Sequence, residues 1–180
     1  MPDTTLQIDT ERLVLRPHTL RDFEDSLAMW SDASVTRFIG GRPFNHEETW
    51  ARLLRYAGHW AMLGFGYWVI RERATERFIG EVGFADYQRD MEPPLGNVPE
   101  AGWALSPDAH GQGYATEALR AVTLWADRRW PGAPTVCMID PDNAASVRVA
   151  EKCGYTQTRT ATYRGNPTLL FERAAQPIAS

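Results

Sequence analysis

The stretch SPDAHGQGYATEAL, residues 106–119, places two glycines around one glutamine and follows them directly with a run of helix-forming residues. A strand, a Gly-x-Gly turn and a helix N-terminus in this order form an anion site. The first amides of a helix have no intrahelical partner, and the helix dipole adds about half a positive charge. Glycine lets a ligand approach the backbone, since a Cβ would hold it away. A plain turn followed by a helix cap has the same spacing, so the neighbouring segments must decide between the two.

Two common nucleotide-binding patterns do not fit this stretch. The Walker pattern requires Gly-Lys followed by Ser or Thr, and this chain lacks it. The dinucleotide pattern GxGxxG requires a glycine where the chain has Thr116, and no clear acidic partner ends a following strand. The stretch therefore belongs to neither class.

The segments on both sides alternate between strand and helix patterns. Before the loop, the sequence predicts one or two short strands ending at Pro17, helices starting near Thr19 and Asn45, and a hairpin over residues 64–87. After it, we expect a helix to about Trp130, a buried strand at 135–140, a short helix ending at Gly154 and a final hairpin. This order indicates an α/β fold, or α+β by some schemes, with one mixed sheet.

The composition is that of one domain of ordinary size. The chain has 180 residues, of which 43% are hydrophobic, so it can bury a substantial core. A net charge of −4 without any block of like charge disfavours nucleic-acid binding. No signal-peptide pattern opens the chain and no apolar run approaches about 18 residues, so we expect a cytoplasmic protein with no membrane contact. The two cysteines and four scattered histidines match neither a disulfide framework nor a metal site.

Several motifs together resemble one enzyme family. The segment His110-Gly111-Gln112-Gly113-Tyr114-Ala115 resembles the acetyl-CoA pyrophosphate loop of the GNAT N-acetyltransferases, whose pattern is Arg/Gln-x-x-Gly-x-Gly/Ala. Gly113 and Ala115 match this pattern, whereas His110 stands where the family has Arg or Gln. The continuation GYATEAL and the segment NAASVRVAEKCGY, residues 143–155, resemble the branch that contains the ribosomal-protein alanine N-acetyltransferases. ERLVLRP, GYWVI and FIGEVGF fall in the expected order.

The resemblance implies a GNAT fold: a mixed, mostly antiparallel central sheet of about six to seven strands flanked by about four helices. A single domain would cover residues 8–173, with short tails at 1–7 and 174–180. The resemblance also implies acetyl-CoA as co-substrate, no metal, and an amine acceptor, either a peptide N-terminus or a small molecule, in a monomer or homodimer. The implied cofactor contacts are Trp103, Ala104, Leu105, His110, Gly111, Gln112, Gly113, Tyr114, Ala115, Thr116 and Asn143.

Glu100 is the candidate general base. In EAGWAL, residues 100–105, strand alternation places Glu100, Gly102 and Ala104 on one face. A partly buried carboxylate at the head of an apolar strand, just before the cofactor loop, would accept a proton from the attacking amine more readily than an exposed one. Glu81 is the alternative base, and a solvated strand-end glutamate without a catalytic role is the other interpretation of Glu100.

Ser146 is the candidate acid for the departing thiolate, a role that rests on the resemblance. Asn143 and Ser146 lie three residues apart at a helix start, so they share one face. In the family branch the asparagine contacts the pantetheine arm and the serine hydroxyl can serve the sulfur. An N-cap followed by an ordinary first-turn residue has the same pattern. Many GNAT enzymes use a tyrosine instead, and Tyr155 and Tyr163 are the alternatives here, although Tyr155 occupies a position usually filled by a core aromatic.

These residues predict an N-acetyltransferase in which the amine attacks acetyl-CoA directly in a ternary complex. Neither cysteine is placed as a nucleophile. The alternative is a non-catalytic acyl-CoA-binding module of the same fold that acts as a sensor or interaction protein. The two N-terminal helices and the loop between Tyr87 and Glu100 are expected to wall the acceptor side. That loop carries Asp86, Asp90, Glu92 and Glu100 against Arg89, which would give a mildly acidic rim suited to a cationic amine; a solvated run of charges without such a role is the other interpretation. The aromatics Trp30, Phe38, Phe44 and Trp60 would either line an acceptor pocket or fill the core, and most are expected in the core.

Overall fold

The computed structural model describes residues 6–177, so the expected tails at 1–7 and 174–180 lie partly outside the described range. Within that range one mixed sheet has the strand order β1-β2-β3-β4-β6-β7-β9-β8-β5. The strands are β1 (Ile8–Asp9), β2 (Leu13–Pro17), β3 (Tyr67–Glu72), β4 (Phe78–Ala85), β5 (Met91–Glu92), β6 (Glu100–Leu105), β7 (Thr135–Ile139), β8 (Thr156–Tyr163) and β9 (Asn166–Arg173). The β6–β7 pair is parallel, and the other described pairs are antiparallel. The mixed, mostly antiparallel sheet is therefore confirmed, and the two-residue strands β1 and β5 raise the strand count above the expected range.

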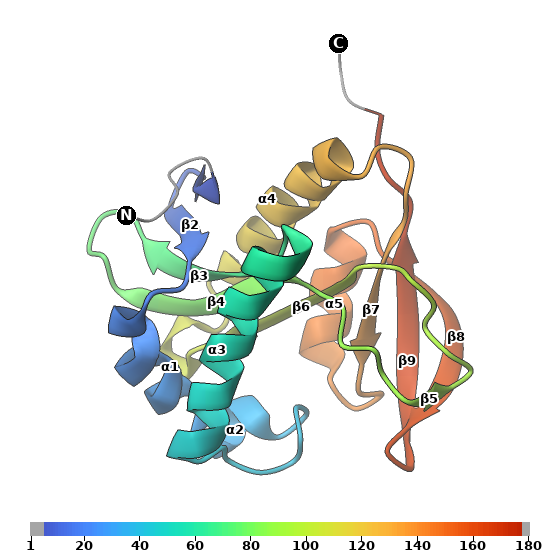
Figure 1. Cartoon of the computed structure of the whole chain (residues 1–180), viewed down its shortest axis with the longest axis horizontal. Coiled ribbons are helices and arrows are strands. Elements are labelled where there is room, and N and C mark those ends of the chain that lie inside the picture. Colours follow the sequence, from blue (N-terminus) through green and yellow to red (C-terminus); the bar gives the residue numbers. More distant parts are fainter. Residues whose placement is uncertain (1–5, 178–180) are drawn as a thin grey trace.

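Helices cover both faces of the sheet (Figure 1). They are α1 (Phe23–Trp30), α2 (Ala33–Thr36), α3 (His46–Leu63), α4 (Tyr114–Arg129) and α5 (Ala144–Lys152). Neighbouring residues of β4 show which helix lies on which face. The side chain of Glu81 contacts α1 and α3, whereas Val82 packs with Leu119 of α4. The single turn α2 is an element that the sequence pattern does not predict.

Local sequence explains where the helices begin. Asn45 Oδ1 accepts a hydrogen bond from Glu48 N, and Glu48 Oε2 accepts one from Asn45 N, both at 2.9 Å. This capping box starts α3 where the sequence predicts it. Thr19 and Asp22 form the same kind of box, but it leads into a 3-10 turn, and α1 begins only at Phe23.

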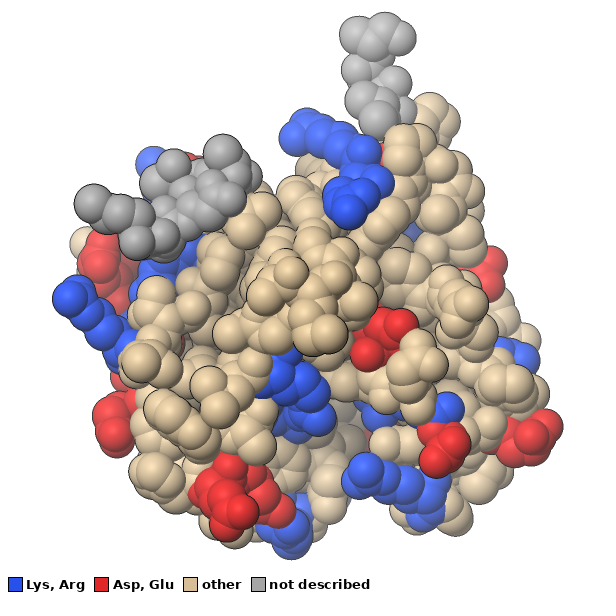
Figure 2. Space-filling model, in the orientation of Figure 1, with Lys and Arg blue, Asp and Glu red and all other residues tan. Residues whose placement is uncertain are grey.

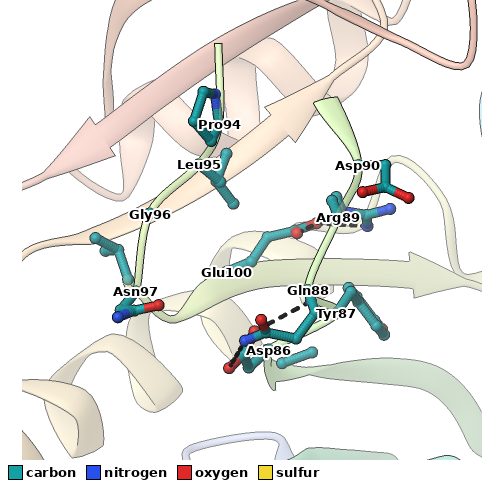
Figure 3. Close-up of a pocket in the computed structure, with 12 residues that line it drawn as sticks. Asp86, Tyr87, Gln88, Arg89, Asp90, Pro94, Leu95, Gly96, Asn97 and Glu100 are labelled. Atoms are coloured by element: carbon teal, nitrogen blue, oxygen red, sulfur yellow. Dashed lines mark hydrogen bonds and ion pairs between the residues drawn. The ribbon is translucent and has the colours of Figure 1, made fainter. Parts of the chain in front are cut away.

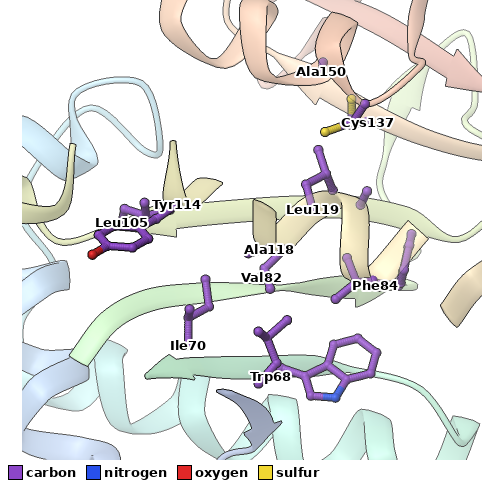
Figure 4. Close-up of a cluster of buried hydrophobic side chains, with 14 of the residues drawn as sticks. Trp68, Ile70, Val82, Phe84, Leu105, Tyr114, Ala118, Leu119, Cys137 and Ala150 are labelled. Carbon is purple, nitrogen blue, oxygen red and sulfur yellow. The ribbon is translucent and has the colours of Figure 1, made fainter. Parts of the chain in front are cut away.

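The main core fills the space between the sheet and α4 (Figure 4). Strands β3 and β4 contribute Trp68, Ile70, Val82 and Phe84, and α4 contributes Ala118 and Leu119. Four tryptophans, Trp60, Trp68, Trp125 and Trp130, meet edge to face beside them, with ring centroids between 4.7 and 6.0 Å apart. This geometry is the one that aromatic quadrupoles prefer. Trp60 therefore belongs to the core, as the sequence predicts.

Strands β6 and β7 separate almost as soon as they meet. Their register contains one pair, Glu100 with Val136, and Val136 N also donates to Pro99 O at 3.1 Å. On its other side β6 pairs with β4 along its whole length. From Ala101 onward, the edge of β6 that faces β7 consequently has no strand partner within residues 6–177. An opening in the middle of the sheet results, with unpaired backbone groups along one wall.

Candidate active site

A cleft of about 770 Å³ lies at this opening and extends to α3. One wall is formed by residues 100–104 of β6, and the other by Met138, Asp140, Asn143 and Ser146. Trp30 of α1, Arg52 of α3 and Tyr87 close the remaining side, where the sequence predicts the acceptor wall. Figure 2 shows the molecule hollowed on the face that carries α3. A smaller pocket of about 270 Å³ adjoins the cleft, lies against residues 94–98 and shares Glu100 with it (Figure 3).

The loop before α4 presents an uninterrupted series of free amides. Gly111 and Gly113 have φ values of +74° and +80°, which favour glycine. No side chain caps the helix, and the first backbone bond runs from Glu117 N to Gly113 O at 3.1 Å. The amides of residues 111–116 donate no hydrogen bond within the described chain. Together with the helix dipole, these groups can bind a large anion such as a pyrophosphate.

Two side chains hold this loop in place. His110 Nε2 lies 3.0 Å from the carbonyl oxygen of Leu105, so the residue that departs from the expected loop pattern bonds to the end of β6. Arg12 Nη1 donates to Gln112 O at 2.9 Å, while its Nε pairs with Glu117 Oε2 at 2.7 Å. No sequence signal indicates the role of Arg12, because its partners lie about a hundred residues away in the chain.

The side chains of β6 alternate as the sequence predicts. Ala104 belongs to the cluster around Trp30, on the α1–α3 side, whereas Ala101 and Leu105 belong to the main core on the α4 side. Trp103 packs partly against that core and also lines the cleft. Trp103 and Ala104 line the cleft and Leu105 does not, but the expected pantetheine contacts are made by backbone groups, so the buried side chain of Leu105 does not decide them.

Glu100 lies in the wall shared by the cleft and the smaller pocket and is bound by Arg89 (Figure 3). Arg89 Nε donates to Oε2 at 2.6 Å and Nη2 to Oε1 at 2.7 Å. The guanidinium lies over the rings of Tyr87 and Tyr163, at 4.6 and 4.8 Å from their centroids. Each carboxylate oxygen retains a second lone pair, so Glu100 can still accept a hydrogen bond from a group in the cleft.

Glu81, the alternative base, is enclosed in the core and does not line the cleft. Its donors are Ser26 Oγ at 2.7 Å, Trp30 Nε1 at 3.0 Å and Tyr56 OH at 3.0 Å. His18 Nε2 lies 3.3 Å from Oε1. Burial alone would raise the pKa of Glu81, but His18, the hydrogen bond from Ser26 and the charge of Arg52 outweigh burial and hold the pKa below its usual value. Glu100 is therefore the carboxylate of the two that a substrate can reach.

Asn143 and Ser146 both line the cleft. Asn143 Oδ1 accepts a hydrogen bond from Ser146 N at 3.1 Å and so caps α5. The side-chain nitrogen Nδ2 of Asn143 and the hydroxyl of Ser146 donate no hydrogen bond within residues 6–177, so both are available to a ligand. Tyr163 also lines the cleft, whereas Tyr155 is buried and bonds to Thr135 Oγ1 at 2.8 Å.

The two cysteines are free and buried, and neither lines the cleft. Burial raises the pKa of the Cys137 thiol far above its usual value and that of Cys153 to about 11. Both therefore remain protonated near neutral pH and are poor nucleophiles. Over residues 6–177 no three His, Cys, Asp or Glu side chains converge as metal ligands. No helix in that range has the length and apolar character needed to cross a membrane.

The cleft is richer in arginine than the sequence predicts. Its described lining contains Arg37, Arg52, Arg55, Arg89 and Arg164 but only three carboxylates, those of Asp86, Glu100 and Asp140. Figure 2 shows such basic side chains on several sides of the hollow. Of the acids expected at the rim, Asp86 and Glu100 line the cleft and Asp90 lines the adjoining smaller pocket, whereas Glu92 lines neither, and Arg89 pairs with Glu100.

Comparison with known proteins gives concordant results. A family model described as the acetyltransferase (GNAT) domain matches residues 12–156. The chain is 31% identical over 110 residues to the uncharacterized protein YkkB of Bacillus subtilis, covering 61% of this chain and 62% of YkkB. It is 32% identical over 163 residues to FsC-acetyl coenzyme A-N(2)-transacetylase of Aspergillus fumigatus, covering 85% of this chain and 66% of that protein. In both cases the match spans less than two thirds of the relative's length.

Solved structures agree with these matches. A member of the GnaT family of acetyltransferases from Bordetella pertussis superimposes with a TM-score of 0.82 at 30% identity, over 93% of this chain and 99% of that one. A ribosomal-protein alpha-N-acetyltransferase, RimL, solved with coenzyme A, gives a TM-score of 0.76 over 93% of this chain and 97% of that one. At 18% identity, the likeness to RimL is one of fold.

Proposed function

The chain belongs to the GNAT family of acetyltransferases, and on this premise we propose that it transfers the acetyl group of acetyl-CoA to a primary amine. The observation that carries the proposal is the opening between β6 and β7 combined with the unpaired amides of residues 111–116. Those amides would hold the pyrophosphate without any lysine, which suits a chain of net charge −4. The free edge of β6 at Trp103 and Ala104 would bond the pantetheine amides, and Asn143 would add a side-chain contact.

The bound donor supplies an activated acyl thioester, and the proposed roles of the chain are to orient the amine and move two protons. Glu100 takes a proton from the attacking amine, directly or through a water, while Arg89 keeps the carboxylate in one orientation. Ser146 Oγ gives a proton to the departing thiolate, and Tyr163 is the alternative donor. The protonated, buried cysteines support direct attack by the amine rather than a covalent enzyme intermediate.

The acceptor is proposed to be a peptide N-terminus or a small amine. The relatives with named activities support the general reaction but differ in their acceptors, because RimL is named for a ribosomal protein and the Aspergillus enzyme is not. The cofactor side of the site therefore supports the reaction class, whereas the opposite wall of the cleft selects the acceptor.

Two measurements on the purified chain test this function. Acetyl-CoA should raise the thermal unfolding temperature in a saturable manner, and a panel of small amines and short peptides should yield at least one acceptor that releases free CoA thiol. Stabilisation without turnover of any acceptor would instead indicate a non-catalytic acyl-CoA-binding module. Absence of both stabilisation and turnover would contradict the cofactor assignment itself.

A further inference from the structure

Arg52 of α3 lines the cleft with part of its hydrogen-bonding capacity unused. Its guanidinium lies over the rings of Trp30 and Phe44, at 4.0 and 4.9 Å from their centroids, so aromatic rings fix its orientation. Nη1 donates to Tyr56 OH at 3.1 Å. Nε is buried without a partner, and Nη2 makes no hydrogen bond to the described residues. Buried N–H groups are nearly always paired, so this edge is arranged for a group that the chain itself does not supply.

The charge of Arg52 is also without a direct carboxylate partner in the described part of the chain. The one acid linked to it is Glu81, through Tyr56, whose hydroxyl lies 3.0 Å from Glu81 Oε2. Glu81 is already bound by Ser26 and Trp30. Since guanidinium groups stay protonated at any physiological pH, a positive charge that Glu81 offsets only through space, without an ion-pair contact, lines the cleft.

Arg55 adds a second charge on the same side. It lies three residues along α3, one helical turn from Arg52, and it also lines the cleft. Its guanidinium lies 5.1 Å from the ring centroid of Tyr87, and it forms no ion pair with the described carboxylates. Two arginines on successive turns thus create a positive region within the cleft.

This positive region lies in the same cleft as β6, the strand that carries Glu100. The ring of Tyr56, which binds Arg52, stacks on Tyr67 at 4.5 Å, and the Tyr67 hydroxyl covers Gly102 of β6. Arg52 and Glu100 both line the same cleft. An acceptor long enough to span this cleft could therefore have its amine near Glu100 and its other end near Arg52.

We propose that the acceptor is a small amine that also carries a carboxylate, that is, an amino acid. Arg52 binds the carboxylate through Nε and Nη2, and Arg55 adds long-range attraction. A carboxylate matches this edge because its two coplanar oxygens accept two parallel N–H bonds from one guanidinium. The inference rests on the proposed function, since it assigns the acceptor of the same acetyl transfer.

The test uses matched pairs of acceptors with the full chain. Glycine, β-alanine and γ-aminobutyrate are compared with their carboxamides at equal concentrations of neutral amine, with CoA thiol release as the readout. At least one acid should show a kcat/KM ten times or more that of its amide.

Arg52→Gln should reduce this ratio of acid to amide to near one without changing the KM for acetyl-CoA. Arg52→Lys, which keeps the charge but not the paired edge, should give an intermediate ratio. Arg42→Gln, which alters an arginine paired with Glu48 outside the cleft, should leave the ratio unchanged.

The outcomes separate this inference from the general function. Equal turnover of acids and amides overturns the carboxylate site and leaves the acetyltransferase intact. Preference for phosphoethanolamine over β-alanine overturns the choice of a carboxylate, and a raised KM for acetyl-CoA in Arg52→Gln assigns Arg52 to the donor instead. If no amine is acetylated, thermal stability of the CoA-bound chain decides: Arg52-dependent stabilisation by the acids alone supports the site, and its absence overturns it.

Discussion

Arg89 and Glu100 form a two-bond ion pair in the wall of the cleft, with Nε 2.6 Å from Oε2 and Nη2 2.7 Å from Oε1. Both groups are largely buried, and Tyr87 and Tyr163 cover the guanidinium. The pair fixes the direction of the Glu100 carboxylate before any substrate arrives. Such prior orientation is what a group that assists amine attack requires.

Replacing Glu100 by glutamine removes this proton acceptor with little change in shape. We expect kcat to fall roughly 10²- to 10⁴-fold, the usual contribution of general acid–base catalysis, while acetyl-CoA still stabilises the protein against heat. Glu92→Gln is the matched control, because Glu92 lies on β5 and does not line the cleft. A Glu100→Gln enzyme that retains its full rate would exclude Glu100 as the base.

Replacing Ser146 by alanine removes the hydroxyl proposed to protonate the thiolate. We expect kcat to fall roughly tenfold or more, with an unchanged KM for acetyl-CoA, because the N-cap bond uses Ser146 N rather than the hydroxyl. Tyr163→Phe provides the comparison, since Tyr163 lines the same cleft. If Tyr163→Phe loses rate and Ser146→Ala does not, the tyrosine is the acid.

The sequence predicts those features that depend on neighbouring residues. The Gly111–Gly113 turn, the Asn45–Glu48 box and the alternation along β6 are set by spacing within a few positions, and the structure contains them as expected. The late start of α1 is an instructive difference. The carboxylate of Asp22 accepts hydrogen bonds from Arg16 and Arg71, and the first turn after Thr19 remains a 3-10 turn.

The electrostatics of the site could not be predicted in the same way. Arg89 bonds to Glu100, eleven positions further along the chain, and Arg12 bonds to Gln112, a hundred positions further. Arg52 faces the cleft because Trp30 and Phe44 orient it from other elements. Each of these contacts is created by folding, and a single sequence contains no periodicity that reports them.

The loop proposed to hold the pyrophosphate, residues 110–116, can be tested with two glycine-to-alanine variants that introduce similar backbone strain. Gly113→Ala places a Cβ at φ +80°, and Gly132→Ala places one at φ +77° in a turn where no atom lies within 4 Å. Both should lose about 1–2 kcal/mol of stability, because left-handed backbone is costly for alanine. Only Gly113→Ala should also weaken acetyl-CoA binding, measured by calorimetry. Equal affinity in the two variants would contradict the placement of the pyrophosphate at this loop.

Asp22 should make folding stability depend on pH. Burial by itself would raise the pKa of Asp22, but hydrogen bonds from Arg16 and Arg71 outweigh it and hold the pKa well below its usual value. The resulting stabilisation is complete well above the unfolded-state pKa and is lost progressively from about pH 5 downward, as the pH falls toward the folded-state pKa. Asp22→Asn should lower the free energy of unfolding by about 3–5 kcal/mol at pH 7, because it leaves partly buried arginines without their counter-ion. Between pH 7 and pH 3 the free energy of unfolding of this variant should fall less steeply than that of the unchanged protein.

Urea denaturation between pH 7 and pH 3 measures this difference. Asp25→Asn is the control, since Asp25 contacts the same Arg71 at 2.8 Å but its side chain is 45% exposed. An exposed pair is worth at most about 1 kcal/mol. If the two variants share one pH dependence, Asp22 is not the group that governs it.

Gly102 and Tyr67 should be coupled, because the tyrosine hydroxyl occupies the space that a side chain on β6 would need. A Cβ at Gly102 would lie 2.0 Å from the Tyr67 oxygen and 3.2 Å from Cζ. Gly102→Ala should therefore destabilise the fold by about 1–3 kcal/mol through overpacking and narrow the cleft beside Glu100. Tyr67→Phe removes the clashing oxygen, so the double variant should recover part of the loss, and a double-mutant cycle in urea measures the coupling. Gly58→Ala, in α3 with no atom within 4 Å, should be neutral or stabilising. Additive effects of the two changes would show that Tyr67 does not occupy this position in solution.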